Sequence, residues 1–339
     1  MVDISKRTLK WISEEYYGMY KFLETIGLER INSHCADLNG SHYDTLETLP
    51  SALEFAQLVR VSRPALIRDC PVPKATTRWT DEYLAKQCGE SLISVAVTPN
   101  GRADAITRGP DERLYFAEPH VEHMSMTEFL VRLSSGHDSQ STDSEVVYLQ
   151  SQDGNLFSST PDVESEFRAL SSDVPKDLPF ITEALDPYEN IYSVIRGSKT
   201  FTVFPPTEGW CMEERIYPHA TYERSPETSE LTLVPSPSSG PPVRWSSIQD
   251  PTDTDSLPSE AHPIYITVNA GESLYLPAGW WHYVRQSEMT IAVNYWYDME
   301  SRGMSWVWLN LLRGGGKGNS PPPGNEGDEF VDSSDDEED

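Results

Sequence analysis

Residues 272–286 read ESLYLPAGWWHYVRQ, and residues 290–298 follow as TIAVNYWYD. Aromatic and β-branched residues dominate both stretches, and in the second one apolar residues take alternate positions, which is typical of strands. Pro277, Ala278 and Gly279 interrupt the first stretch and predict a tight turn between two strands. These residues predict that the C-terminal half has a β core.

Further short strands are predicted upstream of this stretch. Residues 191–206 read IYSVIRGSKTFTVFPP and predict a hairpin around Gly197. Strands are also predicted over 64–69, 92–99, 146–152 and 264–268. Short strands at close spacing with turn residues between them favour a sandwich, barrel or jelly roll.

Helical patterns lie mainly outside this β region. Apolar residues at helical spacing predict helices over 10–26, 53–60 and 124–133, the last capped by Ser125 or Thr127. Residues 304–312 (MSWVWLNLL) are apolar on nearly every side, so this predicted helix must be buried, in its own domain or against a partner. We therefore divide the chain into an N-terminal helical segment (1–44), a main domain (45–313) and a C-terminal tail (314–339).

The composition excludes several function classes. The 339 residues include 54 acidic and 26 basic ones, a net charge of −28, which repels nucleic acid and anionic membranes. No apolar run approaches the ~20 residues of a membrane span, and the first residues contain no apolar signal core. Four separated cysteines without a CxxC motif suit a reducing compartment, so we expect an intracellular protein, cytoplasmic or nuclear.

Two stretches have the composition of loops or tails. Residues 225–262 are rich in Pro, Ser and Asp and predict a long loop inside the main domain. The tail contains nine acidic residues, one lysine and almost no apolar residues, so we expect it to be disordered and solubilising. Phosphorylation of Ser333 or Ser334 is the less favoured interpretation of the tail.

Three residues could form a site at strand ends. Asp186 precedes a predicted strand, His282 opens another, and Lys199 lies on the second arm of the predicted hairpin. Such a set could supply two ligands of a facial triad and a cation for an anionic ligand. Taken alone, His282 is more often a satisfied core or surface residue, and Lys199 more often a solvated one. The motif His120-x-x-His123 also has ligand spacing, but no second pair matches it.

The order of several segments is the most specific signal in the chain. These segments are SRPALIRD, SVAVTPNGRADA, VVYLQSQDGNL, DPYENIYSVIRGSKTFTVFPP, AGESLYLPAGWWHYVRQ and AVNYWYDM. In this order they resemble the JmjC (cupin-like) family of Fe(II)- and 2-oxoglutarate-dependent oxygenases over 45–313, and most closely its small protein lysyl hydroxylases. The resemblance implies a mainly β fold, a double-stranded β-helix (jelly roll, cupin-like) with an N-terminal α/β extension and a C-terminal helix.

The resemblance also implies roles for individual residues. Asp186 matches the carboxylate of the family's HxD motif, and His282 matches the second iron-binding histidine. Lys199 matches the lysine that pairs with the far carboxylate of the cosubstrate 2-oxoglutarate, and Tyr148 matches a tyrosine that assists this lysine.

Two asparagines complete the implied cosubstrate pocket. Asn190 and Asn294 match pocket amides, although capping of a turn or strand explains each of them equally well. The resemblance assigns no further protein residue as catalytic.

The chain departs from the family pattern at the HxD motif. Position 184, where the motif has its histidine, is Ala184, and a stretch with a core strand that relatives carry before the motif is absent. We favour an excision in the gene model or splice form over decay of the site, because Lys199, His282, Tyr148 and Asn294 all remain. In either case we expect weak iron binding, little turnover and a compromised fold.

The sequence thus leaves three functions open. The first is a protein hydroxylase, impaired in this chain, with a lysyl side chain of another protein as substrate. The second is a non-catalytic JmjC-like binding or scaffold protein, and the third is a cupin with small-molecule chemistry. Relatives use their C-terminal helices to dimerise, so we expect the helix over 304–312 to form a homodimer.

Overall fold

The computed structural model describes residues 42–136, 145–149, 156–157, 166–182, 190–237, 240–253, 255–259, 261–286, 289–297 and 321–328. The helices of these residues are α3 (Ala52–Val61), α4 (Pro73–Arg78), α5 (Asp81–Cys88), α6 (Met126–Gly136) and α7 (Pro179–Thr182), with 3-10 helices η1 (Arg168–Asp173) and η2 (Pro206–Met212). The helices predicted over 10–26 and 304–312, and the residues Asp186 and Ala184, lie outside the described residues.

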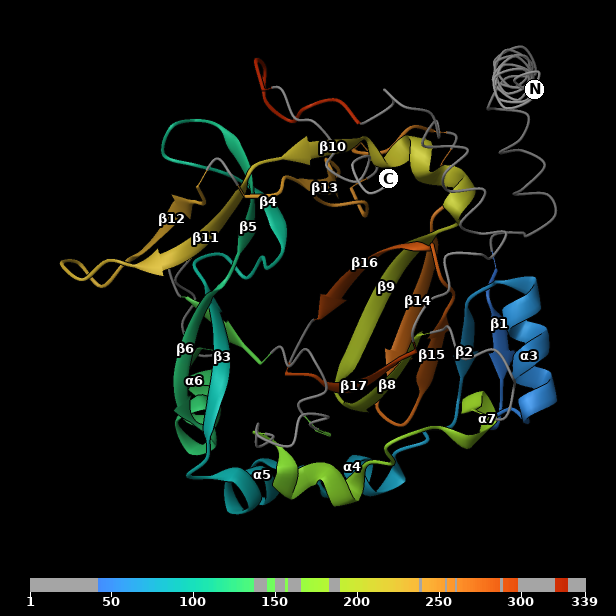
Figure 1. The fold of residues 1–339 in the computed structure, drawn as a ribbon. Coiled ribbons are helices and arrows are strands. Elements are labelled where there is room, and N and C mark those ends of the chain that lie inside the picture. Colours follow the sequence, from blue (N-terminus) through green and yellow to red (C-terminus); the bar gives the residue numbers. More distant parts are fainter. Residues whose placement is uncertain are drawn as a thin grey trace, which may run out of the picture.

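Two facing sheets form the centre of the fold (Figure 1). The larger sheet has the order β1 (Asp44–Leu46), β2 (Ala65–Ile67), β15 (Ser273–Leu276), β8 (Asn190–Arg196) and β17 (Ile291–Trp296). The smaller sheet has the order β14 (Ile264–Asn269), β9 (Ser198–Phe204) and β16 (Trp281–Gln286). This arrangement confirms the predicted jelly-roll-like β fold.

The larger sheet is buried on both faces. Alternate residues along β8 belong to different apolar clusters: Tyr192 and Val194 pack between the two sheets, whereas Ile191 and Ile195 pack outward. Because side chains in a strand alternate between the faces, one strand supplies both cores. The inner cluster also contains Phe201, Val203, Ile264, Ile266, Val268, Leu274, Leu276 and Trp280.

The predicted hairpin at 191–206 is wrong in one respect. Its two strands exist, but β8 pairs with β15 and β17, whereas β9 pairs with β14 and β16. Gly197 has φ +72, and a Cβ there would lie 2.6 Å from the carbonyl oxygen of Met289. The turn therefore needs glycine, and it carries the chain from one sheet to the other rather than back along the same sheet.

The same kind of crossing occurs at the predicted turn of residues 277–279. β15 ends at Leu276 in the larger sheet, and β16 begins at Trp281 in the smaller one. Trp280 anchors this crossing, since its buried indole Nε1 donates a 3.0 Å hydrogen bond to the carbonyl of Ser62.

Three smaller sheets surround the two central ones on the left and at the top of Figure 1. They contain β6 (His120–Ser125), β3 (Leu92–Thr98) and β7 (Val146–Tyr148); β12 (Leu231–Pro235), β11 (His219–Arg224), β5 (Leu114–Glu118) and β4 (Ala105–Arg108); and β10 (Glu214–Tyr217) with β13 (Val243–Ser246). The strands β12 and β13 correct the prediction that 225–262 is one long loop. Pairing with β11 and β10 orders these polar residues, which the composition alone did not reveal.

The C-terminal tail is ordered in part, which also corrects a prediction. Residues 321–328 lie against β10, where Pro323 forms a parallel bridge with Ile216. These residues bury little apolar area; hydrogen bonds from their backbone and from Asn325 hold them.

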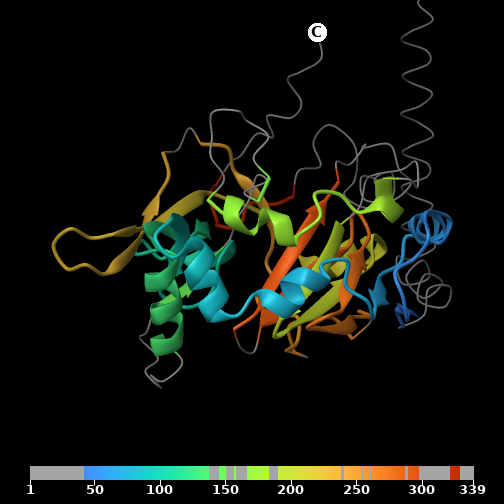
Figure 2. The ribbon, with the colours of Figure 1, turned by 90° about the horizontal axis from the view of Figure 1, so that it is seen from below.

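Helices cover the outer face of the larger sheet (Figure 2). Helix α3 begins with a capping box between Ser51 and Glu54 and buries Phe55, whose ring meets Phe180 and Tyr275 edge-on at centroid distances of 5.3 Å. Helix α6 is capped by Ser125, as one of the two predicted caps, through reciprocal bonds with Glu128. Among the described residues, no helix is long and apolar enough to cross a bilayer.

A buried carboxylate ties two of these helical segments to η1. Asp173 accepts hydrogen bonds from Arg78 (2.9 Å), the indole of Trp79 (3.2 Å) and the hydroxyl of Tyr83 (2.6 Å). Burial acts to raise the pKa of Asp173, but these three donors outweigh it and hold the pKa below its usual value. The contribution of this carboxylate to stability is therefore present above its unfolded pKa of ~3.9 and is lost as the pH falls through the lower folded pKa.

Asp173→Asn is expected to lower the free energy of unfolding at pH 7 by about 2 kcal/mol, because charged hydrogen bonds are replaced by neutral ones. The difference from the unchanged protein should shrink between pH 5 and pH 3, as measured by urea unfolding. The exposed Asp69→Asn is the matched control and should have little effect at either pH. A difference for Asp173→Asn that is equal at pH 7 and pH 3 would contradict the assignment.

Candidate functional site

The inner face between the two central sheets brings most of the predicted site residues together. Lys199 is on the same face of β9 as the inner-cluster residues Phe201 and Val203, and His282 pairs directly with Val203. Asn294 pairs with Tyr192, which also belongs to the inner cluster. Since directly paired residues share a face, all these side chains point between the sheets.

His282 is held in the tautomer that suits a metal ligand. Its Nδ1 lies 3.2 Å from the carbonyl oxygen of Trp280, and because a carbonyl only accepts, Nδ1 carries the proton. Nε2 is thereby left with a lone pair. The surrounding protein lowers the pKa of His282 by desolvation, against the effect of the Trp280 carbonyl, so the ring is neutral at pH 7. The side chain is still open to solvent, because β16 is an edge strand among the described residues.

Lys199 is a cation in an apolar setting. Burial lowers its pKa, and the described residues offer it no carboxylate partner. It lies at the start of β9, opposite Val268 on one side and Gln286 on the other. A lysine placed in this way is stabilised by an anionic ligand, which replaces the lost hydration of the ammonium group.

Asn190 supplies an amide at the opposite end of the inner face. It pairs with Leu276, where β15 ends shortly before the crossing to His282. Its Oδ1 and Nδ2 are buried and have no hydrogen-bonding geometry to any described residue, although the amide lies close enough to Tyr192 to affect the pKa of that hydroxyl. A buried amide in this state favours a polar ligand at this end of the inner face.

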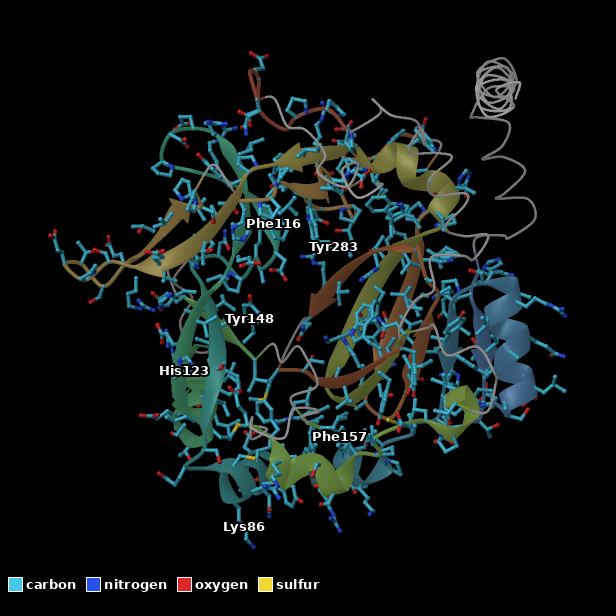
Figure 3. The ribbon with its side chains drawn as sticks, viewed as in Figure 1. Lys86, Phe116, His123, Tyr148, Phe157 and Tyr283 are labelled. Carbon is cyan, nitrogen blue, oxygen red and sulfur yellow. The ribbon has the colours of Figure 1, made fainter. Side chains whose placement is uncertain are left out.

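The other two predicted site residues, Asn294 and Tyr148, lie farther from the centre of the inner face. Asn294 faces inward but is exposed, because β17 is also an edge strand in the described part of the chain. Tyr148 ends β7, in the sheet of β3 and β6, and Figure 3 shows it beside β3 rather than beside β9. Its buried hydroxyl has no hydrogen-bond partner among the described residues, so the predicted contact with Lys199 is not made there.

The described residues do not form an iron site by themselves. They contain no group of three His, Cys, Asp or Glu side chains that could hold a metal ion. Asp186, the second predicted ligand, lies outside the described residues, four positions before β8 begins at Asn190. The motif of His120 and His123 is also unsuitable, since both are on β6, where residues three apart point to opposite faces.

Sequence reasoning missed an aromatic residue at this site. Trp296 lies on the inner face of β17, opposite Asn190, with its ring 6.4 Å from that of Tyr192. It is 68% exposed, which is unusual for a tryptophan pointing between two sheets. The alternation along 290–298 places it on the same face as Asn294, so the pattern could have identified it.

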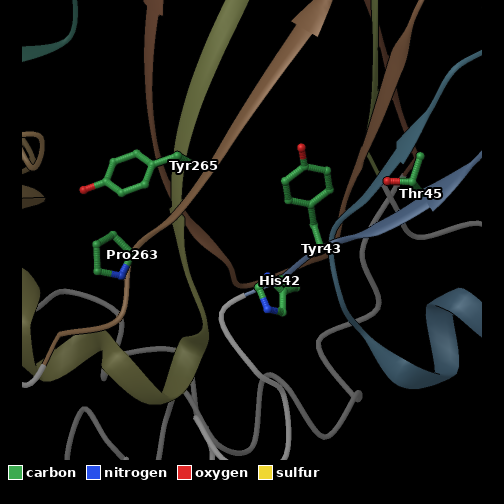
Figure 4. A pocket seen from close by; sticks show the side chains of 5 residues that line it. All are labelled: His42, Tyr43, Thr45, Pro263 and Tyr265. Atoms are coloured by element: carbon green, nitrogen blue, oxygen red, sulfur yellow. The ribbon is translucent and has the colours of Figure 1, made fainter.

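A separate pocket of about 510 Å³ opens elsewhere on the surface, between the start of β1 and the start of β14. Figure 4 shows Tyr43 and Tyr265 standing over it, with His42, Thr45 and Pro263 completing the lining. None of the predicted site residues that the structure describes lines it, so we do not assign the site to this pocket.

Comparisons with known proteins agree with this arrangement. The model of the family described as a cupin-like domain matches residues 50–303. The chain is 32% identical to the human bifunctional peptidase and (3S)-lysyl hydroxylase JMJD7 over 296 residues, which covers 79% of this chain and 87% of the relative. It is 30% identical to the Arabidopsis thaliana lysine-specific demethylase JMJ32 over 321 residues, with 81% and 86% covered.

A further relative is the JmjC domain-containing protein E of Dictyostelium discoideum, which is 28% identical over 313 residues, with 78% of this chain and 86% of the relative covered. The family match covers more than half of the chain, and these relatives align with most of its length. The chain therefore belongs to the cupin-like family and is of its JmjC type.

Proposed function

We propose that this protein binds 2-oxoglutarate between its two central sheets. We further propose that it is a lysyl hydroxylase of the JmjC type whose iron site lacks one histidine in this sequence. The observation that carries the proposal is Lys199, a desolvated cation without an ion-pair partner in the described part of the chain. The lysyl hydroxylase activity in the name of the human relative supports a lysyl side chain of another protein as substrate.

The spacing of Lys199 and His282 supports a dicarboxylate as the ligand. Lys199 pairs with Gln286, four residues along β16 from His282. At ~3.3 Å per residue the two backbones are about 13 Å apart along the strand. A lysine side chain followed by an extended five-carbon dicarboxylate spans about this distance. One carboxylate would then pair with Lys199, and the second would lie next to the free Nε2 of His282.

JmjC oxygenases use Fe(II), and oxygenases of this kind hold it with two histidines and one carboxylate. In this chain Asp186 and His282 are the candidates, and Ala184 occupies the position of the other histidine. With two protein ligands instead of three, we expect weak iron binding and little turnover.

Excision of a segment before Asp186 remains our preferred explanation. Among the described residues, β16 pairs only with β9 and β17 only with β8, so each sheet has an open edge, and Figure 1 shows the two edges on the same side. Seven residues separate Thr182 from Asn190, whereas a strand added to each edge needs about 12 residues with the turn. The alignment with the human relative runs over 296 positions but takes up 79% of this chain, so the relative contributes residues that this chain lacks.

A non-catalytic binding protein is the alternative, and the alanine at position 184 favours it. The choice between them depends on turnover rather than on cosubstrate binding. We also propose an intracellular location, which the free buried thiols of Cys70, Cys88 and Cys211 support.

Lys199→Met is expected to weaken 2-oxoglutarate binding at least ~30-fold, because it removes the buried charge that pairs with the carboxylate. The same change should leave the protein as stable or more stable, since an unpaired buried cation is removed. Calorimetric titration and thermal unfolding measure the two effects. Lys176→Met, at a lysine in the loop after η1, is the control, and unchanged affinity in Lys199→Met would remove the proposed cosubstrate site.

Ala184→His is expected to raise Fe(II) affinity at least ~10-fold, because losing even an outer partner of a metal ligand commonly costs that much. It should also make succinate formation from 2-oxoglutarate detectable. Ala184→Leu should give no gain, and adding His282→Ala should abolish the gain.

Two outcomes would argue against this account. Robust succinate formation by the unchanged chain would show that the missing histidine does not matter. No gain in iron affinity in Ala184→His would show that position 184 is not the place of the missing iron ligand.

A further inference from the structure

The C-terminal residues 321–328, here called the clasp, add to the free edge of β10. The amide of Ile216 donates to the carbonyl of Pro322 (3.1 Å), and the amide of Gly324 donates to the carbonyl of Ile216 (2.8 Å). These two bonds are those of a parallel strand pair. The clasp lies outside the residues that match the cupin-like family, 50–303.

A glycine is required in the middle of the clasp. A Cβ at position 324 would overlap the ring of Tyr217. This ring is buried and its hydroxyl is fixed by a 2.7 Å hydrogen bond with Ser247, so it has little freedom to move away. The close approach of the backbone to Tyr217 therefore selects glycine at this position.

The side-chain amide of Asn325 forms two hydrogen bonds with the backbone of a second strand. Its Oδ1 accepts from the amide of Leu114 (2.6 Å), and its Nδ2 donates to the carbonyl of the same residue (2.9 Å). Asp328 completes the contact through an ion pair with Arg113 and a 3.1 Å hydrogen bond from Asn325. Leu114 opens β5, so the clasp joins the sheet of β10 and β13 to the sheet of β5.

Three specified positions in eight residues are a recognition pattern rather than general packing. We propose that the surface formed by Ile216, Tyr217, Leu114 and Arg113 is a peptide-binding site, and that the clasp is its ligand in cis. The ligand is an extended peptide with the pattern Gly-Asn-x-x-Asp preceded by proline. It binds by strand addition, as in other peptide sites that use an exposed edge.

This surface is connected to the outer face of the smaller sheet, and the connection does not depend on the proposed function. β10 follows η2, and β13 is tied to η2 by a 2.7 Å bond from Ser246 to the carbonyl of Met212. Met212 belongs to an apolar cluster that includes Trp281, the residue before His282. Trp281 pairs with Phe204, and both belong to this cluster rather than to the inner one, so a clasp that fixes β10 and β13 also supports the outer face of the smaller sheet.

The test uses the full chain with Gly324→Ala, which expels the clasp while leaving the surface intact. A labelled peptide of residues 319–330 should bind this variant at least tenfold more tightly than the unchanged chain, whose own clasp competes at high effective concentration. In hydrogen exchange, the amides of Ile216 and Leu114 should exchange at least tenfold faster in the variant without peptide, and adding peptide should restore their protection.

Matched controls separate recognition from unfolding. Glu326 is exposed and makes no hydrogen bond or ion pair to the described residues of the surface, so Glu326→Ala in the chain or in the peptide should change nothing. Peptides with Asn325→Ala or Asp328→Ala should bind at least tenfold more weakly. If Gly324→Ala does not fold, Asn325→Ala in the full chain replaces it.

The proposal is overturned if the folded variant does not bind the peptide, or if its exchange at Ile216 and Leu114 equals that of the unchanged chain. Neither result tests Lys199, because the clasp contacts Ile216, Leu114 and Arg113, and both measurements are made without 2-oxoglutarate. Loss of cosubstrate binding in Lys199→Met is a separate measurement, so the two proposals fail independently.

Discussion

The arrangement of the site depends on a sheet that is buried on both faces. Within β8, each inward residue that faces the smaller sheet is followed by an outward one that packs under the helices. A shift of one residue in the register of β8 would move Asn190 and Tyr192 to the helical side and break both cores at once. The two cores therefore fix the register, and the register fixes which polar side chains meet between the sheets.

Much of this fold was predictable from the sequence because its signals are local. Aromatic and β-branched residues identified β14, β16 and β17, with apolar alternation in β17, and Gly197 identified a turn. The sequence did not reveal that this turn joins different sheets. The turn residue fixes the local backbone, whereas the choice of strand partner is made by apolar burial between residues far apart in the chain.

Composition predicted the structure of the polar segments less well. Residues 225–262 and 321–328 contain few apolar residues, which argued against order, yet backbone hydrogen bonds hold β12, β13 and residues 321–328 in place. The strand β12 pairs with β11 over five residues, and a single asparagine amide replaces a strand partner for Leu114. Such order depends on the position of an existing strand edge, which composition does not encode. The residues Lys199, His282, Asn190 and Asn294 were predicted from the family resemblance, and their roles stay a prediction; the strand pairing places all four on the inner face.

The clasp also affects how a shortened form of this protein would behave in solution. A chain cut back to the region shared with the family would leave β10 with one bare row of amide and carbonyl groups, and Leu114 without its amide partner. Bare strand edges pair readily with the edges of other molecules. Shortening the protein would then favour self-association and precipitation. This precipitation would be mistaken for instability of the β core.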